Sequence, residues 1–292
     1  MEVEQKKSLP SPMTVEQQIE NLKSINLKIE NEEFAKETLN RISYFRLIKA
    51  YGLGLKPKNG NYFDGITFER IVKIYEFNSR LRNIIFPLIE DVEISLRCRL
   101  ANHMSHMYGA LGYEISDNFS NSEIHNKILE DLDTEIERAK SPFVDNFRER
   151  YDEGKLPFYA AVELFTFGML SKMFANLKNS DKKAIASEFK VGYTYLESWF
   201  KSITNVRNIC AHYGRLYNIK LAIKPELYKE YPKEYNYRIF GVLLTLKYIV
   251  SNKSLWQCFM TDLCALFNQY QEYVAFEAIG FPEDWEDYLK ID

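Results

Sequence analysis

The chain has few of the residues that usually build metal centres, disulfides and tight turns. Its 292 residues include only four histidines and four cysteines. The cysteines, Cys98, Cys210, Cys258 and Cys264, contain no Cys-x-x-Cys pair and show no standard zinc pattern, so we expect reduced thiols and no metal or other cofactor. Because only 12 glycines and 9 prolines are available for turns, the composition favours helices over many short strands.

Long apolar runs and an excess of basic residues are also missing. No apolar run reaches the roughly 18 residues that a membrane span needs, and the polar N-terminus lacks the apolar centre of a signal peptide. We therefore expect a soluble, cytoplasmic protein with no membrane partner. The 41 acidic residues outnumber the 38 basic ones, for a net charge of −3, which argues against a broadly basic nucleic-acid coat but not against a local basic site. We expect no DNA partner.

Apolar residues recur with helical spacing through most of the chain, which predicts an all-α fold, a multi-helix bundle. The longest periodic segment, from Thr67 to about Tyr108, contains Pro87, which should kink this helix or split it. Glycines and prolines at 52–66 mark a loop that allows a small hairpin. Other helices are predicted near residues 14–24, 31–51, 122–140, 158–177, 193–213, 235–251 and 254–274, with Thr14 and Asn31 as N-caps and Ser180 or Asp181 opening one more.

The sequence contains no convincing internal boundary. No repeat of fixed period and no low-complexity tract is present. Residues 14–292 are therefore expected to form a single helical domain after a flexible leader at residues 1–13. If the domain has two lobes, the break at Asp152–Pro157 separates residues 14–152 from residues 153–292.

One hexapeptide, RNICAH at residues 207–212, carries most of the chemical information. In a helix, Asn208 and His212 share one face because they are four residues apart, and the long Arg207 side chain can bend toward them. Metal-independent RNA cleavage needs a base for the ribose 2′-OH, an acid for the leaving 5′-oxygen and a cation for the phosphate. His212 suits the proton transfers and Arg207 suits the phosphate, while Asn208 could orient His212.

A single copy of this motif supplies only one histidine, and so fills one of the two proton-transfer roles. A two-fold dimer would place two identical motifs across one cleft, so we expect a homodimer with a composite site. The alternative interpretation is structural. In that case Arg207 and His212 would only interact with the carbonyls at the polar end of a helix.

Two further Arg-to-His pairs of similar spacing, Arg97–His103 and Arg99–His106, could form a degenerate second motif. A simpler interpretation is a helical ion pair between Glu93 and Arg97, with His103 as a polar helix residue. The lysines at 178, 182 and 183 either contact phosphates or form a solvated helix end. The candidate RNA-binding residues are Arg97, Arg99, His103, Lys182, Lys183 and Arg215.

Several stretches, in this order and spacing, resemble the Abi-like abortive-infection family, the AbiD/AbiF type of bacterial anti-phage protein. The landmarks are SYFRL at 43–47, IYEFNSRLR at 74–82, IEDVEISLR at 89–97, PFYAAVE at 157–163, VRNICAHYGRLYN at 206–218 and GFPEDW at 280–285. That family is grouped with the HEPN superfamily. The resemblance implies a HEPN-like helical fold, a dimer, and RNA cleavage or RNA binding through Arg207, Asn208 and His212.

The resemblance thus implies an anti-phage toxin, a HEPN endoribonuclease that needs no metal. The Arg97–His106 region is not a clean copy of the motif, which leaves open whether each chain brings one site or two. Because HEPN relatives include proteins that only bind RNA, a non-catalytic protein that sequesters a small structured RNA is the alternative. A third interpretation, supported by the acidic net charge and by aromatic residues expected to be exposed, is a protein-interaction subunit without an RNA role.

Overall fold

The computed structural model describes residue 9 and residues 11–58, 60–151 and 154–291 of the chain. Within these residues every regular element is helical, and the only β pairings are two isolated bridges, Lys28 with Thr67 and Phe119 with Leu177. The all-α prediction is therefore confirmed. The expected flexible leader at residues 1–13 lies mostly outside the described residues.

The chain divides into two compact units. The first contains the residues up to Ser79 together with Tyr270–Val274, and the second contains Arg80–Gln269 and the residues from Ala275 onward. The division at Ser79 falls inside helix α3 (Phe68–Tyr108). The expected break between lobes, at Asp152–Pro157, falls within the second unit, and its residues 152 and 153 lie outside the described part.

The first unit contains α1 (Val15–Ser24), α2 (Glu32–Arg41), the π-helical turn η1 (Phe45–Lys49) and the start of α3. Both predicted N-caps are confirmed. Thr14 and Gln17 form a capping box, and the Asn31 side chain accepts a hydrogen bond of 3.0 Å from the Phe34 N–H. The loop at 52–66 contains turns and no strand among its described residues, so the small hairpin is not formed.

Helix α3 continues without a break through Pro87. Proline has no N–H to donate, so the Asn83 carbonyl loses its partner within the helix. Burial of the following turns compensates for this loss, because Leu88, Val92 and Leu96 are each 0 % exposed. The predicted split into two helices therefore does not occur, and α3 ends before Gly109, whose φ is +77°.

The second unit is built around α7 (Phe167–Asn176) and α9 (Tyr193–Ala211), which pack against each other. The rings of Phe174 and Phe200 meet edge to face between them, with their centroids 5.2 Å apart. Helix α4 (Ser122–Ala139) packs on α7, while α8 (Asn179–Glu188) and α10 (Ile239–Ile249) pack on α9.

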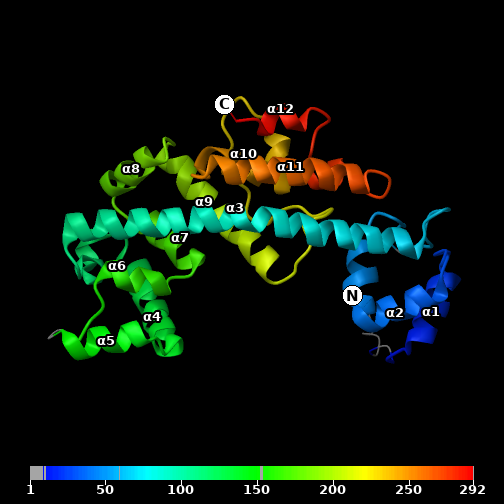
Figure 1. Ribbon diagram of the computed structural model, residues 1–292, viewed down its shortest axis with the longest axis horizontal. Helices are drawn as coiled ribbons and strands as arrows, with labels where there is room; N and C mark the ends of the chain where they lie inside the picture. Colours follow the sequence, from blue (N-terminus) through cyan, green and yellow to red (C-terminus); the bar gives the residue numbers. More distant parts are fainter. Residues whose placement is uncertain (1–8, 10, 59, 152–153, 292) are drawn as a thin grey trace, which may run out of the picture. The chain divides into compact units, whose positions relative to one another are not determined.

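The remaining helices of the second unit are α5 (Pro142–Arg150), α6 (Phe158–Ala161), α11 (Lys253–Tyr270) and α12 (Trp285–Leu289), and the 3₁₀ turns are η2 (Gly112–Glu114), η3 (Ser116–Asn118), η4 (Val162–Leu164), η5 (Lys233–Tyr237) and η6 (Phe276–Ile279). Figure 1 shows α8, α10 and α12 on one side of the second-unit part of α3, with α4, α5 and α6 on the other.

Three predicted helices have different limits in the structure. The segment 158–177 is not one helix but α6, η4 and α7, because Thr166 is extended and its hydroxyl accepts a hydrogen bond of 3.3 Å from the Met169 N–H. The segment 31–51 is divided between α2 and η1. Helix α8 begins after Lys178 rather than after Ser180 or Asp181.

None of the helices in the described residues combines the length and the apolar character that are needed to cross a membrane.

Candidate functional site

The hexapeptide at 207–212 lies at the C-terminal end of α9, in the second unit. Val206 and Cys210 face the core and are 0 % and 6 % exposed. Arg207 is half-buried, whereas Asn208 and His212 are exposed. His212 is the residue that follows the last turn of the helix, and its N–H donates a hydrogen bond of 3.0 Å to the Asn208 carbonyl. The helix therefore presents its polar end to solvent at this position.

A Schellman cap holds the chain immediately after His212. Gly214 N–H donates to the Ile209 carbonyl at 2.7 Å, and Tyr213 N–H donates to the Cys210 carbonyl at 3.1 Å. The left-handed residue is Tyr213, with φ +56°, rather than a glycine. A Cβ on Gly214 would lie 2.9 Å from Ile209 Cγ2, so glycine is needed there for close approach. Arg82 adds a hydrogen bond of 2.9 Å to the Gly214 carbonyl.

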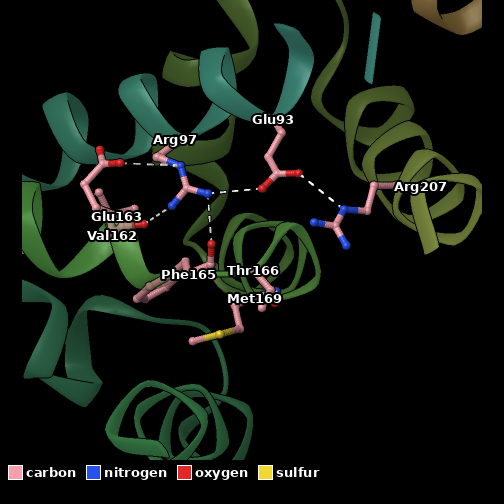
Figure 2. A network of polar contacts seen from close by, with 8 residues as sticks. All are labelled: Glu93, Arg97, Val162, Glu163, Phe165, Thr166, Met169 and Arg207. Atoms are coloured by element: carbon pink, nitrogen blue, oxygen red, sulfur yellow. Dashed lines mark hydrogen bonds and ion pairs between the residues drawn. The ribbon is translucent and has the colours of Figure 1, made fainter. Parts of the chain in front are cut away.

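Glu93 of α3 connects Arg207 to a second arginine. Its Oε2 lies 3.7 Å from Arg207 Nε, and its Oε1 lies 3.1 Å from Arg97 Nη2 (Figure 2). The expected helical ion pair between Glu93 and Arg97 is thus confirmed. In the described part of the chain, Arg207 Nε has no hydrogen bond, so Glu93 holds it electrostatically, and no partner is found for its two terminal nitrogens.

Arg97 joins α3 to the break between η4 and α7. Its guanidinium donates to the Val162 carbonyl and, at 2.9 Å, to the Phe165 carbonyl (Figure 2). Both carbonyls lie where the chain leaves helical geometry, so Arg97 supplies donors from outside the helix, and the Val162 carbonyl also accepts from the Phe165 N–H at 3.1 Å. The Arg97 side chain is only 13 % exposed. These contacts hold the Glu93 carboxylate, and through it Arg207, in a defined position.

A groove of about 410 Å³ adjoins the end of α9. It is lined by Arg82, Asn83, Phe86, Pro87, Cys210, Ala211 and Tyr213. Tyr213, next to His212, is 68 % exposed, so an aromatic ring borders both the groove and the motif. Burial raises the pKa of the Cys210 thiol to about 12, which keeps this thiol neutral.

The family comparison matches residues 37–218 to the family described as Abi-like protein. The chain belongs to the Abi-like protein family. The match begins in α2 and ends just beyond the cap of α9, so it includes the whole Glu93–Arg97–Arg207 network. Membership in this family supports a role in abortive infection. No curated protein and no solved structure matches the chain.

The histidines of the other two candidate pairs of this Abi-like protein have partners outside the Glu93–Arg97–Arg207 network. His103 Nε2 lies 2.8 Å from Asp181 Oδ1, and the Tyr108 hydroxyl donates to the other oxygen of that buried carboxylate at 2.9 Å. His106 is exposed, and its Nδ1 lies 2.7 Å from the Asn102 carbonyl. Among the described residues, neither histidine forms a hydrogen bond with Arg97 or Arg99. The geometry favours the interpretation of His103 as a helix residue with a structural partner.

The candidate cations are similarly dispersed. Lys182 is 8 % exposed and donates to Glu197 at 2.9 Å, so it is not part of a solvated helix end as one interpretation held. Lys183 is exposed and lies 6.0 Å from the Tyr193 ring centroid. Arg215 follows the Schellman cap and is half-buried. Arg99 pairs with Glu188 at 3.2 Å.

Sequence reasoning missed Glu93 as a partner of Arg207, and it missed Arg82 and Tyr213 beside the motif. Glu93 was visible only as the local partner of Arg97, because its second contact joins residues far apart in the chain. In the described residues, no group of three or more His, Cys, Asp or Glu side chains is arranged to hold a metal ion.

Proposed function

We propose that this Abi-like protein is a HEPN-type endoribonuclease that acts in abortive infection against phage. It would be a toxin that cuts RNA without a metal ion, at a composite site formed by two copies of the chain. The observation that carries this proposal is the arrangement at the end of α9. Two exposed polar side chains, Asn208 and His212, lie beside an arginine whose Nε faces Glu93 and whose terminal nitrogens have no partner in the described part of the molecule.

The chemistry follows from the three side chains. A base takes the proton of a ribose 2′-OH, and the 2′-oxygen attacks the adjacent phosphorus. The bond from phosphorus to the 5′-oxygen then breaks, and an acid gives that oxygen a proton. The products are a 2′,3′-cyclic phosphate and a 5′-hydroxyl. His212 is the residue for one proton transfer, and Arg207 stabilises the charge on the phosphate.

The second proton-transfer group is the His212 of another copy. A two-fold axis next to the end of α9 would bring two motifs to one phosphate. The exposed Tyr213 adjoins His212 and offers apolar surface for such a contact. Lys183 and Arg215 remain candidates for contacts to the rest of the RNA, whereas the other candidate residues, Arg97, Arg99, His103 and Lys182, are engaged by protein partners.

The test compares wild type with His212→Ala and Arg207→Ala in purified form and in cells. Wild type is expected to leave RNA ends with cyclic phosphates in the presence of EDTA, and to cut no RNA that has 2′-deoxyribose at the scissile position. Both variants should lose at least about a hundredfold in rate. His106→Ala is the matched control, because His106 is also an exposed histidine at the end of a long helix.

Full cleavage by His212→Ala would contradict the proposal. If wild type binds RNA without cutting it, the protein is instead the RNA-sequestering alternative. Light scattering on the active fraction tests the composite site separately, since an active monomer would exclude it. If His106→Ala loses cleavage while His212→Ala keeps full activity, the catalytic histidine lies in α3 and not at the end of α9.

A further inference from the structure

A second cavity, of about 790 Å³, lies in the second unit where the ends of α8 and α10 meet the start of α11. Among the described residues, its charged lining consists of one acid, Glu188, and five cations, Arg99, Lys190, Lys247, Lys253 and Lys290. The whole chain has 38 basic and 41 acidic residues, so a ratio of five cations to one acid departs from the average surface. No residue of the motif at the end of α9 lines this cavity.

The single acid of the cavity is already occupied. Arg99 Nε lies 3.2 Å from Glu188 Oε2, and the Arg99 guanidinium carbon lies 4.0 Å from the centroid of the Phe189 ring. Arg99 comes two residues after Arg97, about 200° further round α3, so it faces away from the Glu93 network. Among the described lining residues, Glu188 is the only carboxylate, and it is paired with Arg99.

The lysines are placed by well-defined backbone. Lys190 is the left-handed residue, with φ +56°, of a Schellman cap that ends α8, in which Val191 N–H donates to the Ala186 carbonyl at 3.3 Å. Lys247 Nζ donates to the Tyr288 carbonyl at 2.6 Å. The side chains of Lys190 and Lys290 are exposed, and neither forms a hydrogen bond or ion pair with another described residue.

Cations that outnumber the acids on a concave surface repel one another and attract anions from solution. A ligand with several negative charges a few ångströms apart relieves this repulsion at more than one lysine. Lysine binds phosphate as a point charge, and arginine can add a hydrogen bond through its fork. The volume of the cavity lies within the range of about 300–1,000 Å³ that is usual for ligand sites.

We propose that this cavity is a second, non-catalytic site that binds adjacent phosphate groups. The polyphosphate of a nucleotide and the backbone of an RNA strand present the same chemistry, and the test separates these two sources. The proposal does not depend on RNA cleavage at the end of α9.

The test measures binding of two probes, ATP and a single-stranded RNA oligonucleotide, by calorimetry at one fixed salt concentration. All chains carry His212→Ala so that RNA is not consumed. The test variant combines Lys190→Asn with Lys290→Gln, because asparagine tolerates positive φ at position 190. The control combines Lys172→Gln with Lys201→Gln, two exposed lysines of the same unit that do not line the cavity.

The test variant is expected to raise the Kd of at least one probe about tenfold, and the control less than about twofold. Weakened binding of ATP identifies a nucleotide as a sufficient ligand. Weakened binding of RNA alone identifies the strand. Absence of binding by both probes, or equal weakening in test and control variants, overturns the proposal. If the chain with His212 intact fails to cleave RNA while the binding variants show the expected pattern, only the nuclease function is refuted.

Discussion

Glu93 Oε2 lies 3.7 Å from Nε of Arg207, and this contact joins α3 to the end of the helix that carries the candidate site. The same carboxylate pairs with Arg97, whose guanidinium is fixed by two carbonyls at the start of α7. Because Glu93 approaches Arg207 at Nε, the two terminal nitrogens of the Arg207 guanidinium can both donate to a phosphate. Glu93 is therefore a positioning residue for the proposed reaction.

Glu93→Gln is expected to lower kcat for RNA cleavage about tenfold, which corresponds to about 1.4 kcal/mol. The amide keeps the shape of the side chain but removes the charge that holds Arg207. RNA binding should be unchanged or tighter, since a negative charge is lost from the site. Single-turnover and binding measurements separate the two effects.

Glu163→Gln is the control for Glu93→Gln. Glu163 also faces Arg97, at 4.0 Å, but its side chain is 61 % exposed and it has no contact with Arg207 among the described residues. The cleavage rate of Glu163→Gln should stay within about twofold of wild type, because exposed ion pairs contribute little to the position of their partners. Equal losses of kcat in Glu93→Gln and Glu163→Gln would show that Glu93 does not act by positioning Arg207.

Arg97→Met should destabilise the fold by about 2–4 kcal/mol. The change leaves the Phe165 carbonyl without its Arg97 donor, leaves the Val162 carbonyl with only the Phe165 N–H, and leaves the half-buried Glu93 without its closest cation. Urea unfolding measures the difference in free energy. Arg138→Met is the matched control, since Arg138 is 70 % exposed and pairs only with Glu135 in the described structure, so its effect should stay below about 1 kcal/mol.

Gly214→Ala should lower stability by about 1–3 kcal/mol and displace the cap that follows His212. The new Cβ would lie 2.9 Å from Ile209 Cγ2 and 3.0 Å from the Ile209 carbonyl. Thermal unfolding and the cleavage rate report the two effects. Gly168→Ala in α7 is the opposite case, because its nearest neighbour is 3.7 Å away and helical alanine is favoured by about 0.5–1 kcal/mol. If Gly168→Ala lowers stability and Gly214→Ala does not, the proposed need for glycine at position 214 is wrong.

The four cysteines should differ in their rates of alkylation near pH 8. Cys98 and Cys258 are exposed and are expected to react first. Cys210 is expected to react last, because it is buried and its pKa is raised from 9.0 to about 12. Between these two values the unfolded chain releases the Cys210 proton while the folded chain keeps it, so stability falls and labelling accelerates as the pH rises. Mass spectrometry of quenched samples measures the order, and early labelling of Cys210 in the folded protein would refute it.

Local signals in the sequence were enough to predict the helical class, the caps at Thr14 and Asn31, and the position of RNICAH at the end of a helix. These features depend on interactions within a few residues, such as an N-cap side chain with a nearby N–H or an apolar stripe on one helix face. The Glu93–Arg97 ion pair belongs to the same group, because residues four apart on a helix are neighbours whatever the tertiary fold.

Long-range packing decided the features that define the candidate site. The apolar segment 158–177 has helical spacing throughout, yet it breaks at Phe165 and Thr166, where Arg97 of α3 supplies donors for the released carbonyls. Tyr213, not the following glycine, takes the left-handed position, because Gly214 must pass close to Ile209. The sequence by itself determined which helix carries Arg207 and His212. Only the tertiary structure decided that Glu93 orients Arg207 and that five cations gather around one acid, because both arrangements depend on helices that meet across large separations in the chain.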